Sequence, residues 1–168
     1  MKNLRLFFLL LTLIAQPLFG SEKSSLFTVD MGKLFRSSDF GKKIISTNNI
    51  ARQELQNENE ELESLLLSEE IELSEQRKIL SSDEFRRKAL AFDEKVSIIR
   101  TEQGKKEENL KNKARKEEAE FYKRIYPLLY ELLLDRGGSI LIDQRNVILW
   151  DSTVDITDEA ILLINQVL

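Results

Sequence analysis

Residues 42–80 contain neither glycine nor proline, and this long uninterrupted stretch limits the possible folds of the chain more than any other feature. Glycine and proline are the residues that most often end helices, so the stretch is expected to form one long polar helix. Its apolar positions have a heptad-like spacing and are Leu55, Leu62, Leu66, Leu73 and Leu80. Polar gaps occur at Glu69 and Gln76. This pattern predicts a helix that packs along one side against a partner.

A second helix is expected to begin immediately after the first. Ser81 and Glu84 have the spacing of a capping box, in which each side chain satisfies a backbone amide of the first turn. The apolar positions that follow alternate in steps of three and four residues and are Phe85, Ala89, Phe92, Val96, Ile99 and Leu110. Gln103 and Lys106 occupy this seam before Leu110 and weaken it.

The charges of the two stretches favour their pairing as an antiparallel hairpin. Residues 46–76 carry one basic residue and nine glutamates, whereas residues 77–116 carry thirteen basic and seven acidic residues. At 1.5 Å per residue, an arm of this length reaches about 60 Å. The hairpin is therefore expected to protrude as an arm over residues 42–125, with its tip near 80–84.

The remaining chain has a different character, with β-rich runs at 26–30, 139–143 and 147–151. The last two are separated by three residues, which predicts a β-hairpin. Gly137 and Gly138 are expected to end the second long helix, and Thr157 to cap a closing helix from 158 to 168. The predicted fold class is α+β: residues 21–41 and 126–168 form a small β-rich body, into which the arm is inserted.

A body of about 60–70 residues buries little apolar surface, so oligomerisation is expected. The residues expected to form this oligomerisation body are Leu26, Val29, Met31, Leu34, Phe35, Ile140, Ile142, Val147 and Leu149. For Met31, Leu34, Phe35 and Phe40, an interface between subunits and a core within one subunit are equally compatible with the pattern.

The N-terminal residues are typical of a secretory signal peptide over residues 1–20. Lys2 and Arg5 precede an apolar run of ten residues, 6–15, and small Gly20 precedes a polar stretch. Cleavage is expected near Gly20; a retained anchor is the alternative, although the run is about half the length of a membrane span. The mature chain is therefore expected to be exported.

Composition excludes several functional classes. The chain has no histidine and no cysteine, which removes Ser-His-Asp and Cys-His catalysis and nearly all zinc chemistry. Its glutamate clusters lack the loop pattern of a calcium site. With a net charge of −4, the chain is a poor candidate for nucleic-acid binding. No catalytic, cofactor-binding or metal-binding residue is expected, and the chain is not expected to be an enzyme.

Four segments in order carry a resemblance to a known family. They are VDMGKLFRSSDFGKK (29–43), RKILSSDEFRRKALAFDEKVSIIRTEQ (77–103), RGGSILIDQRNVILW (136–150) and DITDEAILLIN (155–165). Together they resemble the Skp (OmpH-like) family of periplasmic chaperones, over the whole mature chain. The resemblance implies a jellyfish-like homotrimer that holds unfolded outer-membrane proteins between its helical arms without ATP. The best-known members are basic and contact lipopolysaccharide, which the acidic charge of this chain does not favour.

Two groups of residues are candidates for contact with such clients. Tyr122, Tyr126 and Tyr130 recur every four residues at the base of the arm, where the alternative is packing of the arm onto the body. Arg86, Arg87 and Lys88 lie beside the expected tip, where the alternative is simple solubility. A different function also fits the pattern: an exported coiled-coil adaptor that binds a defined envelope partner through the hairpin tip.

Overall fold

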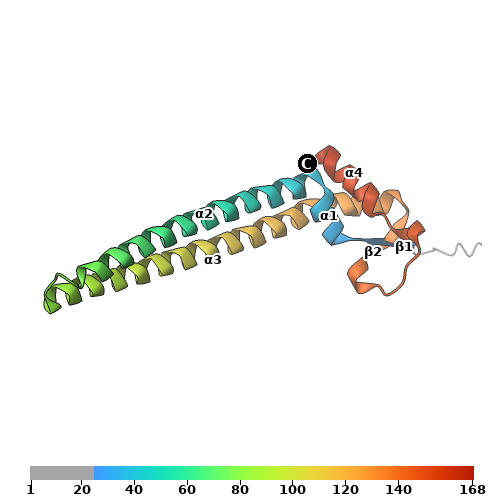
Figure 1. The fold of residues 1–168 in the computed structure, drawn as a ribbon. Helices are drawn as coiled ribbons and strands as arrows, with labels where there is room; N and C mark the ends of the chain where they lie inside the picture. The colour runs from blue at the N-terminus through green and yellow to red at the C-terminus, as the bar shows by residue number, and fades with distance from the viewer. Residues whose placement is uncertain (1–24) are drawn as a thin grey trace, which may run out of the picture.

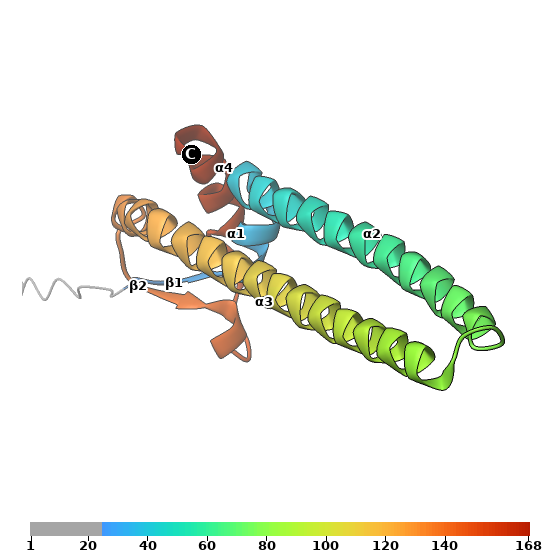
Figure 2. The same cartoon turned by 90° about the vertical axis from the view of Figure 1, so that its left-hand side faces the viewer.

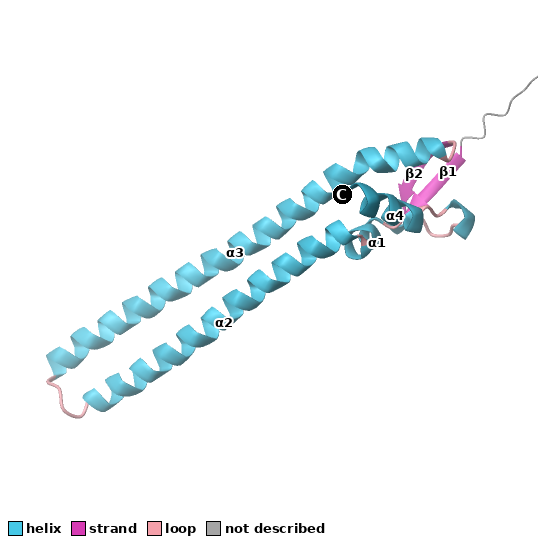
Figure 3. Cartoon of the chain, turned by 90° about the horizontal axis from the view of Figure 1, so that it is seen from above, coloured by secondary structure: helices cyan, strands magenta, loops and turns pink. Residues whose placement is uncertain are grey.

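The structure, a computed structural model, describes residues 25–168. Two long helices, α2 (Asp39–Gln76) and α3 (Ser82–Asp135), lie side by side and project from a small body (Figure 1). The body contains strands β1 (Ser25–Val29) and β2 (Gly138–Asp143) and helices α1 (Met31–Ser37) and α4 (Thr157–Val167). Figure 3 shows the same arrangement from above, with both strands at the body end of the molecule.

Serine caps begin both long helices. Ser38 ends α1 and its hydroxyl accepts a hydrogen bond from the Gly41 amide at the start of α2. At the far end, Ser81 and Glu84 form the predicted capping box at the start of α3. The chain between these helices, residues 77–81, is short, so the helices must run antiparallel. In the described residues, no helix is both long and apolar enough to span a membrane.

The sheet consists of β1 and β2 in parallel, with Leu26 opposite Ile140 and Val29 opposite Asp143. Parallel neighbours need a long crossover connection, and here the crossover is α1 together with the whole arm. The edge of β1 is continued by a single bridge between Thr28 and Asp155, where the Ile156 amide donates to the Thr28 carbonyl at 3.0 Å. The two ends of the described chain are thus joined in one small sheet.

The predicted β-hairpin over 139–151 is wrong. β2 ends at Asp143, whose carboxylate accepts a hydrogen bond from the Arg145 amide and turns the chain into a short 3-10 helix, Gln144–Asn146. Residues 147–150 then form no strand. The turn directs them away from β2, so their high β-propensity is not satisfied within this chain. The body is therefore mostly helical around a two-stranded sheet, rather than β-rich.

The core lies where α1, α4 and the last turns of α3 meet the sheet. Its buried apolar residues are Val29, Met31, Leu34, Phe121, Ile125, Leu129, Leu132, Ile156, Ala160 and Ile164. Thr157 is the first residue of α4 rather than its cap: its hydroxyl donates to Asp155 and accepts from the Asp30 amide, so it joins α4 to β1. The predicted stop of α3 is correct, because the helix ends at Asp135 and Gly137 has a φ of 66°. The expected signal peptide and its cleavage near Gly20 lie outside the described residues.

Candidate functional site

The arm has a thin interior. All eleven residues of the predicted seams are half-buried: four lie on α2, six on α3, and Leu80 lies in the turn between them. Between residues 49 and 120, no residue is fully buried. Two helices alone cannot enclose a side chain on all sides, so the arm has no dry core of its own. Figure 2 shows that the arm is free of any other element along most of its length.

Polar contacts between the helices fill the gaps in the seams. Near the body, the Asn48 amide donates to Glu117 at 2.7 Å. Towards the tip, Lys95 pairs with Glu69, and Lys88 donates to the Gln76 side-chain oxygen at 2.6 Å. Glu69 and Gln76, the gaps in the first seam, are therefore positions where the two helices contact each other through charge and hydrogen bonds. The sequence spacing located these gaps but did not predict which residues of α3 they contact.

The middle of the arm is held by one three-way contact. Glu58 on α2 accepts hydrogen bonds from both seam-breaking residues of α3, from Gln103 at 3.0 Å and from Lys106. The hydrogen bond from Lys106, followed by that from Gln103, lowers the pKa of the Glu58 carboxyl below its usual range. The carboxylate therefore stays ionised and paired at neutral pH.

Large apolar side chains are exposed on the arm outside the seams. Each is at least half exposed, and they are Ile50, Leu65, Leu67, Ile71, Ile79, Leu90 and Ile98. They are spread from near the body to the tip and belong to both helices and, for Ile79, to the turn between them. These residues were not among the predicted contact residues, because they do not fit the heptad spacing. In the sequence they can be recognised as apolar residues that lie between the seam positions.

The three basic residues near the tip have different surroundings. Arg86 pairs with Asp83 at 3.0 Å within the first turns of α3, and Lys88 reaches across to Gln76. Arg87 is exposed. The most exposed apolar residue of the tip is Ile79, at 82%. Of the basic group, Lys88 is thus part of the contact between the helices.

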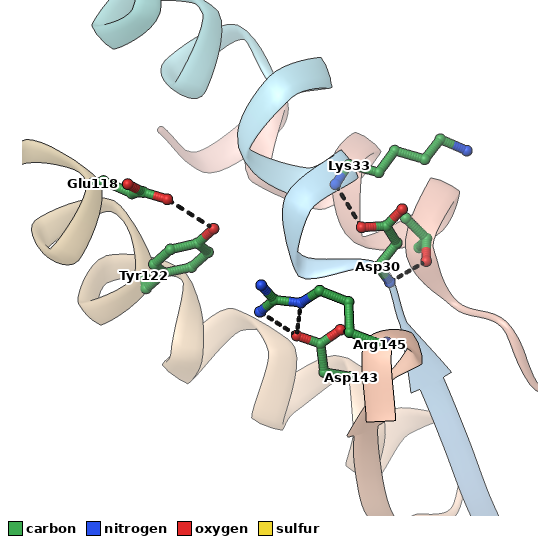
Figure 4. Close-up of polar contacts among 7 residues, drawn as sticks. Asp30, Lys33, Glu118, Tyr122, Asp143 and Arg145 are labelled. Atoms are coloured by element: carbon green, nitrogen blue, oxygen red, sulfur yellow. Dashed lines mark hydrogen bonds and ion pairs between the residues drawn. The ribbon is translucent and has the colours of Figure 1, made fainter. Parts of the chain in front are cut away.

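The three tyrosines at the base of the arm also differ. Tyr122 is half-buried against the rings of Phe35 and Phe121, and its hydroxyl donates to Glu118 at 3.4 Å, as Figure 4 shows. Burial, with the nearby Glu118 charge, raises its pKa. Tyr126 and Tyr130 are exposed, and they line a shallow groove between α3 and the sheet. Only these two are free to contact another molecule.

The residues expected in the oligomerisation body fall into three groups by burial. Val29, Met31 and Leu34 are buried within the chain, and Phe35, Ile142 and Val147 are half-buried. Leu26, Ile140 and Leu149 are exposed. For Met31 and Leu34 the structure favours the core of one subunit; Phe35 and Phe40 both pack their rings on Phe121.

Residues 147–150 carry the most exposed apolar surface of the body. Ile148 is 94% and Leu149 87% exposed, and Trp150 beside them is also exposed. Polar contacts hold the neighbouring backbone: Arg145 makes a two-pronged contact with Asp143, and Asp30 caps α1 at the Lys33 amide (Figure 4). The segment is thus presented from a well-anchored turn.

The described residues contain no group of three or more acidic side chains placed to hold a metal ion. Of the glutamates of α2, Glu58 and Glu69 contact α3, and the others are exposed. Over residues 25–168, the arrangement offers apolar and charged contacts on a long surface, and its hollows are open rather than enclosed.

Comparison with known proteins agrees with this arrangement. The family model for outer membrane proteins (OmpH-like) matches residues 25–163. A search of individually curated proteins found no match. A crystal structure of a candidate outer membrane chaperone (OmpH-like) from Caulobacter crescentus CB15 has the same fold, with a TM-score of 0.80 and 16% sequence identity over 86% of this chain and 85% of that chain. The predicted family resemblance is confirmed, and the chain belongs to the OmpH-like family.

Proposed function

We propose that this protein is an ATP-independent periplasmic chaperone that holds unfolded outer-membrane β-barrel proteins and prevents their aggregation. The observation that carries the proposal is the distribution of exposed apolar side chains along a long arm that has no enclosed pocket. An unfolded chain can make many weak contacts with such a surface. Weak contacts also let the client leave without an energy source, and keeping clients apart suppresses their aggregation.

The body supports assembly into a homotrimer. Leu26 and Ile140 leave apolar side chains exposed on the sheet, and residues 147–150 add an extended segment with unused β-propensity. Exposed apolar surface next to a sheet is a common site of pairing with another copy. Three copies would direct three arms to one side, and simultaneous contacts with one client would raise the overall affinity.

Membership of the family supports the proposed class of client and the proposed location. The Caulobacter crescentus neighbour is described as a candidate outer membrane chaperone, and an N-terminal pattern of export precedes the described residues here. Unfolded barrel proteins crossing the periplasm expose alternating apolar residues, which match scattered single side chains better than a deep groove. Contact with lipopolysaccharide is not part of the proposal, because the chain is acidic.

A second function has one observation in its favour. Ile79 is 82% exposed in the turn at the tip, two residues after Arg77, and the basic residues Arg86 and Arg87 follow early in α3. An adaptor that docks a defined partner through its tip would depend on these few residues. A chaperone with distributed contacts would not.

The decisive experiment measures particle mass and client solubility together. The protein without residues 1–20 is mixed with a urea-unfolded β-barrel protein, diluted into buffer, and analysed by light scattering after size exclusion. We expect a trimer that keeps the client soluble in one discrete complex. A monomer that leaves the client to aggregate would overturn the proposal.

Matched variants separate the two functions. Replacing Leu67 and Ile71 together with serine removes two exposed apolar contacts on one face of α2 and should weaken client holding; Ser68→Ala in the same turn is the control. Ile79→Ser should leave holding nearly unchanged. If Ile79→Ser alone abolished it, the tip adaptor would be the better function.

A further inference from the structure

The two helices of the arm lose their apolar residues at the same level. On α2, residues 56–61 read QNENEE, and on α3, residues 100–109 read RTEQGKKEEN. These segments face each other, because Glu58 contacts both Gln103 and Lys106. We call the two segments together the polar band. It separates an apolar section near the tip from one near the body.

On either side of the polar band, apolar side chains of the two helices lie at the same level. Towards the tip, Leu62 and Leu66 lie between the Glu58 and Glu69 contacts, at the level of Val96 and Ile99 on α3. Towards the body, Leu55 and Leu110 line the same hollow between the helices. Within the polar band, the other polar contacts join residues of one helix, such as Gln56 with Glu60, and do not hold the helices together.

The contact at Glu58 is a weak attachment. The side chains of Glu58 and Lys106 are 43% and 48% exposed, and ion pairs open to solvent contribute little to stability. The side-chain oxygen of Gln103 is buried without a hydrogen-bond partner among the described residues. The free-energy cost of burying this oxygen offsets part of the stabilisation from the hydrogen bond that the Gln103 side-chain nitrogen donates to Glu58. The helices are therefore held together less strongly here than on either side.

The backbone is also weakest at this point. Gly104 lies on the exposed side of α3, and a Cβ atom there would meet nothing within 4 Å. No close approach explains the glycine, as one does at Gly41, where a Cβ would lie 1.8 Å from the Phe35 carbonyl oxygen. Glycine inside a helix lowers its stability because it has the most backbone freedom to lose.

We propose that the polar band is a flexion point, where the helices separate or bend locally so that the tip half of the arm moves independently of the body half. Missing apolar contacts, a weak attachment and a flexible backbone position coincide there. The inference concerns the free chain and does not depend on client holding.

Amide hydrogen exchange of the full mature protein tests this inference without any client. The segments are compared by their protection factors, the ratio of the intrinsic exchange rate of each amide to its observed exchange rate. We expect amides of 56–61 and 100–109 to be at least tenfold less protected than those of 92–99 and 110–117. Equal protection along the arm would overturn the proposal.

Two variants test the cause. Gly104→Ala should raise protection in the polar band about fivefold, the equivalent of about 1 kcal/mol, and the neighbouring exposed Lys105→Ala should change it less than twofold. Glu58→Leu combined with Gln103→Leu makes the seam continuous and should bring protection to the level of the flanking sections. Unchanged protection in folded Gly104→Ala protein would contradict the assigned role of this position.

Discussion

Replacing Phe121 with alanine tests whether burial at the base of the arm, rather than the arm itself, supplies the stability of this fold. Phe121 is fully buried on α3, with the ring of Phe35 edge-on at 5.0 Å and that of Phe40 at 5.6 Å. The same helix carries Phe92, which lies half-buried in the arm seam. The two positions therefore offer the same substitution in the same helix at two levels of burial.

The expected costs differ by the cavity that each substitution leaves. Removing a fully buried phenylalanine side chain costs about 3–5 kcal/mol, because the lost transfer free energy adds to an unfilled space. At Phe92, which is only partly buried, water can occupy the vacated position and the lost apolar burial is smaller, so we expect about 1–2 kcal/mol. The larger loss is comparable to a large part of the total stability of a small domain.

Urea unfolding measures both costs with two signals. The single tryptophan, Trp150, reports on the body, and the far-ultraviolet circular dichroism reports mainly on the long helices. All variants must be compared at one protein concentration, because assembly stabilises the folded state by mass action. A cost for Phe92→Ala equal to or above that for Phe121→Ala would refute the reasoning, since the arm would then carry a core that the structure does not contain.

Three further predictions concern the arm and its base. The hydrogen bond from Lys106 lowers the pKa of the Glu58 carboxyl in the folded arm. The ionised carboxylate therefore stabilises the arm at pH values above the unfolded-state pKa of about 4.3, and this stabilisation is lost as the pH falls through the lower folded-state pKa. In Glu58→Gln protein, acid should therefore lower the melting temperature, followed by the helical circular dichroism signal, less than in the parent protein. Ser81→Ala removes a capping box and should cost about 1 kcal/mol, seen as faster amide exchange confined to the first turn of α3. Gly41→Ala forces a Cβ against the Phe35 carbonyl oxygen and should cost about 3 kcal/mol in urea unfolding, unlike a stabilising alanine at an open helix position.

The helices of the arm were predictable because their signals are local. The apolar residues that the three-and-four spacing selects on α3, from Phe85 to Leu110, are half-buried, and the Ser81–Glu84 spacing identified the start of this helix. The polar contacts between helices were not predictable, because they depend on register. Glu58 faces Gln103 only once the length of the turn between the helices is fixed, and the sequence does not determine which gap faces which.

The sheet was mispredicted because its pairing is not local. Residues 147–150 have the composition of a strand, but a strand needs a neighbouring edge, and the turn at Asp143 directs them away from β2. The edge of β2 is instead occupied by β1, more than a hundred residues earlier in the chain. Of the expected body residues, the pattern could not separate buried Leu34 from exposed Leu149, because both are large and aliphatic.

The parallel pairing of β1 with β2 has a consequence for the order of folding. Residues 30–137 lie between the strands, and closing so long a loop in an unfolded chain is entropically slow. Once the helical hairpin has formed from its local contacts, its two ends meet and the effective loop becomes short. The arm is therefore expected to fold first, and β1 must wait for the C-terminal part of the chain. During synthesis the body is therefore not expected to form until β2 and α4, near the end of the chain, have been made.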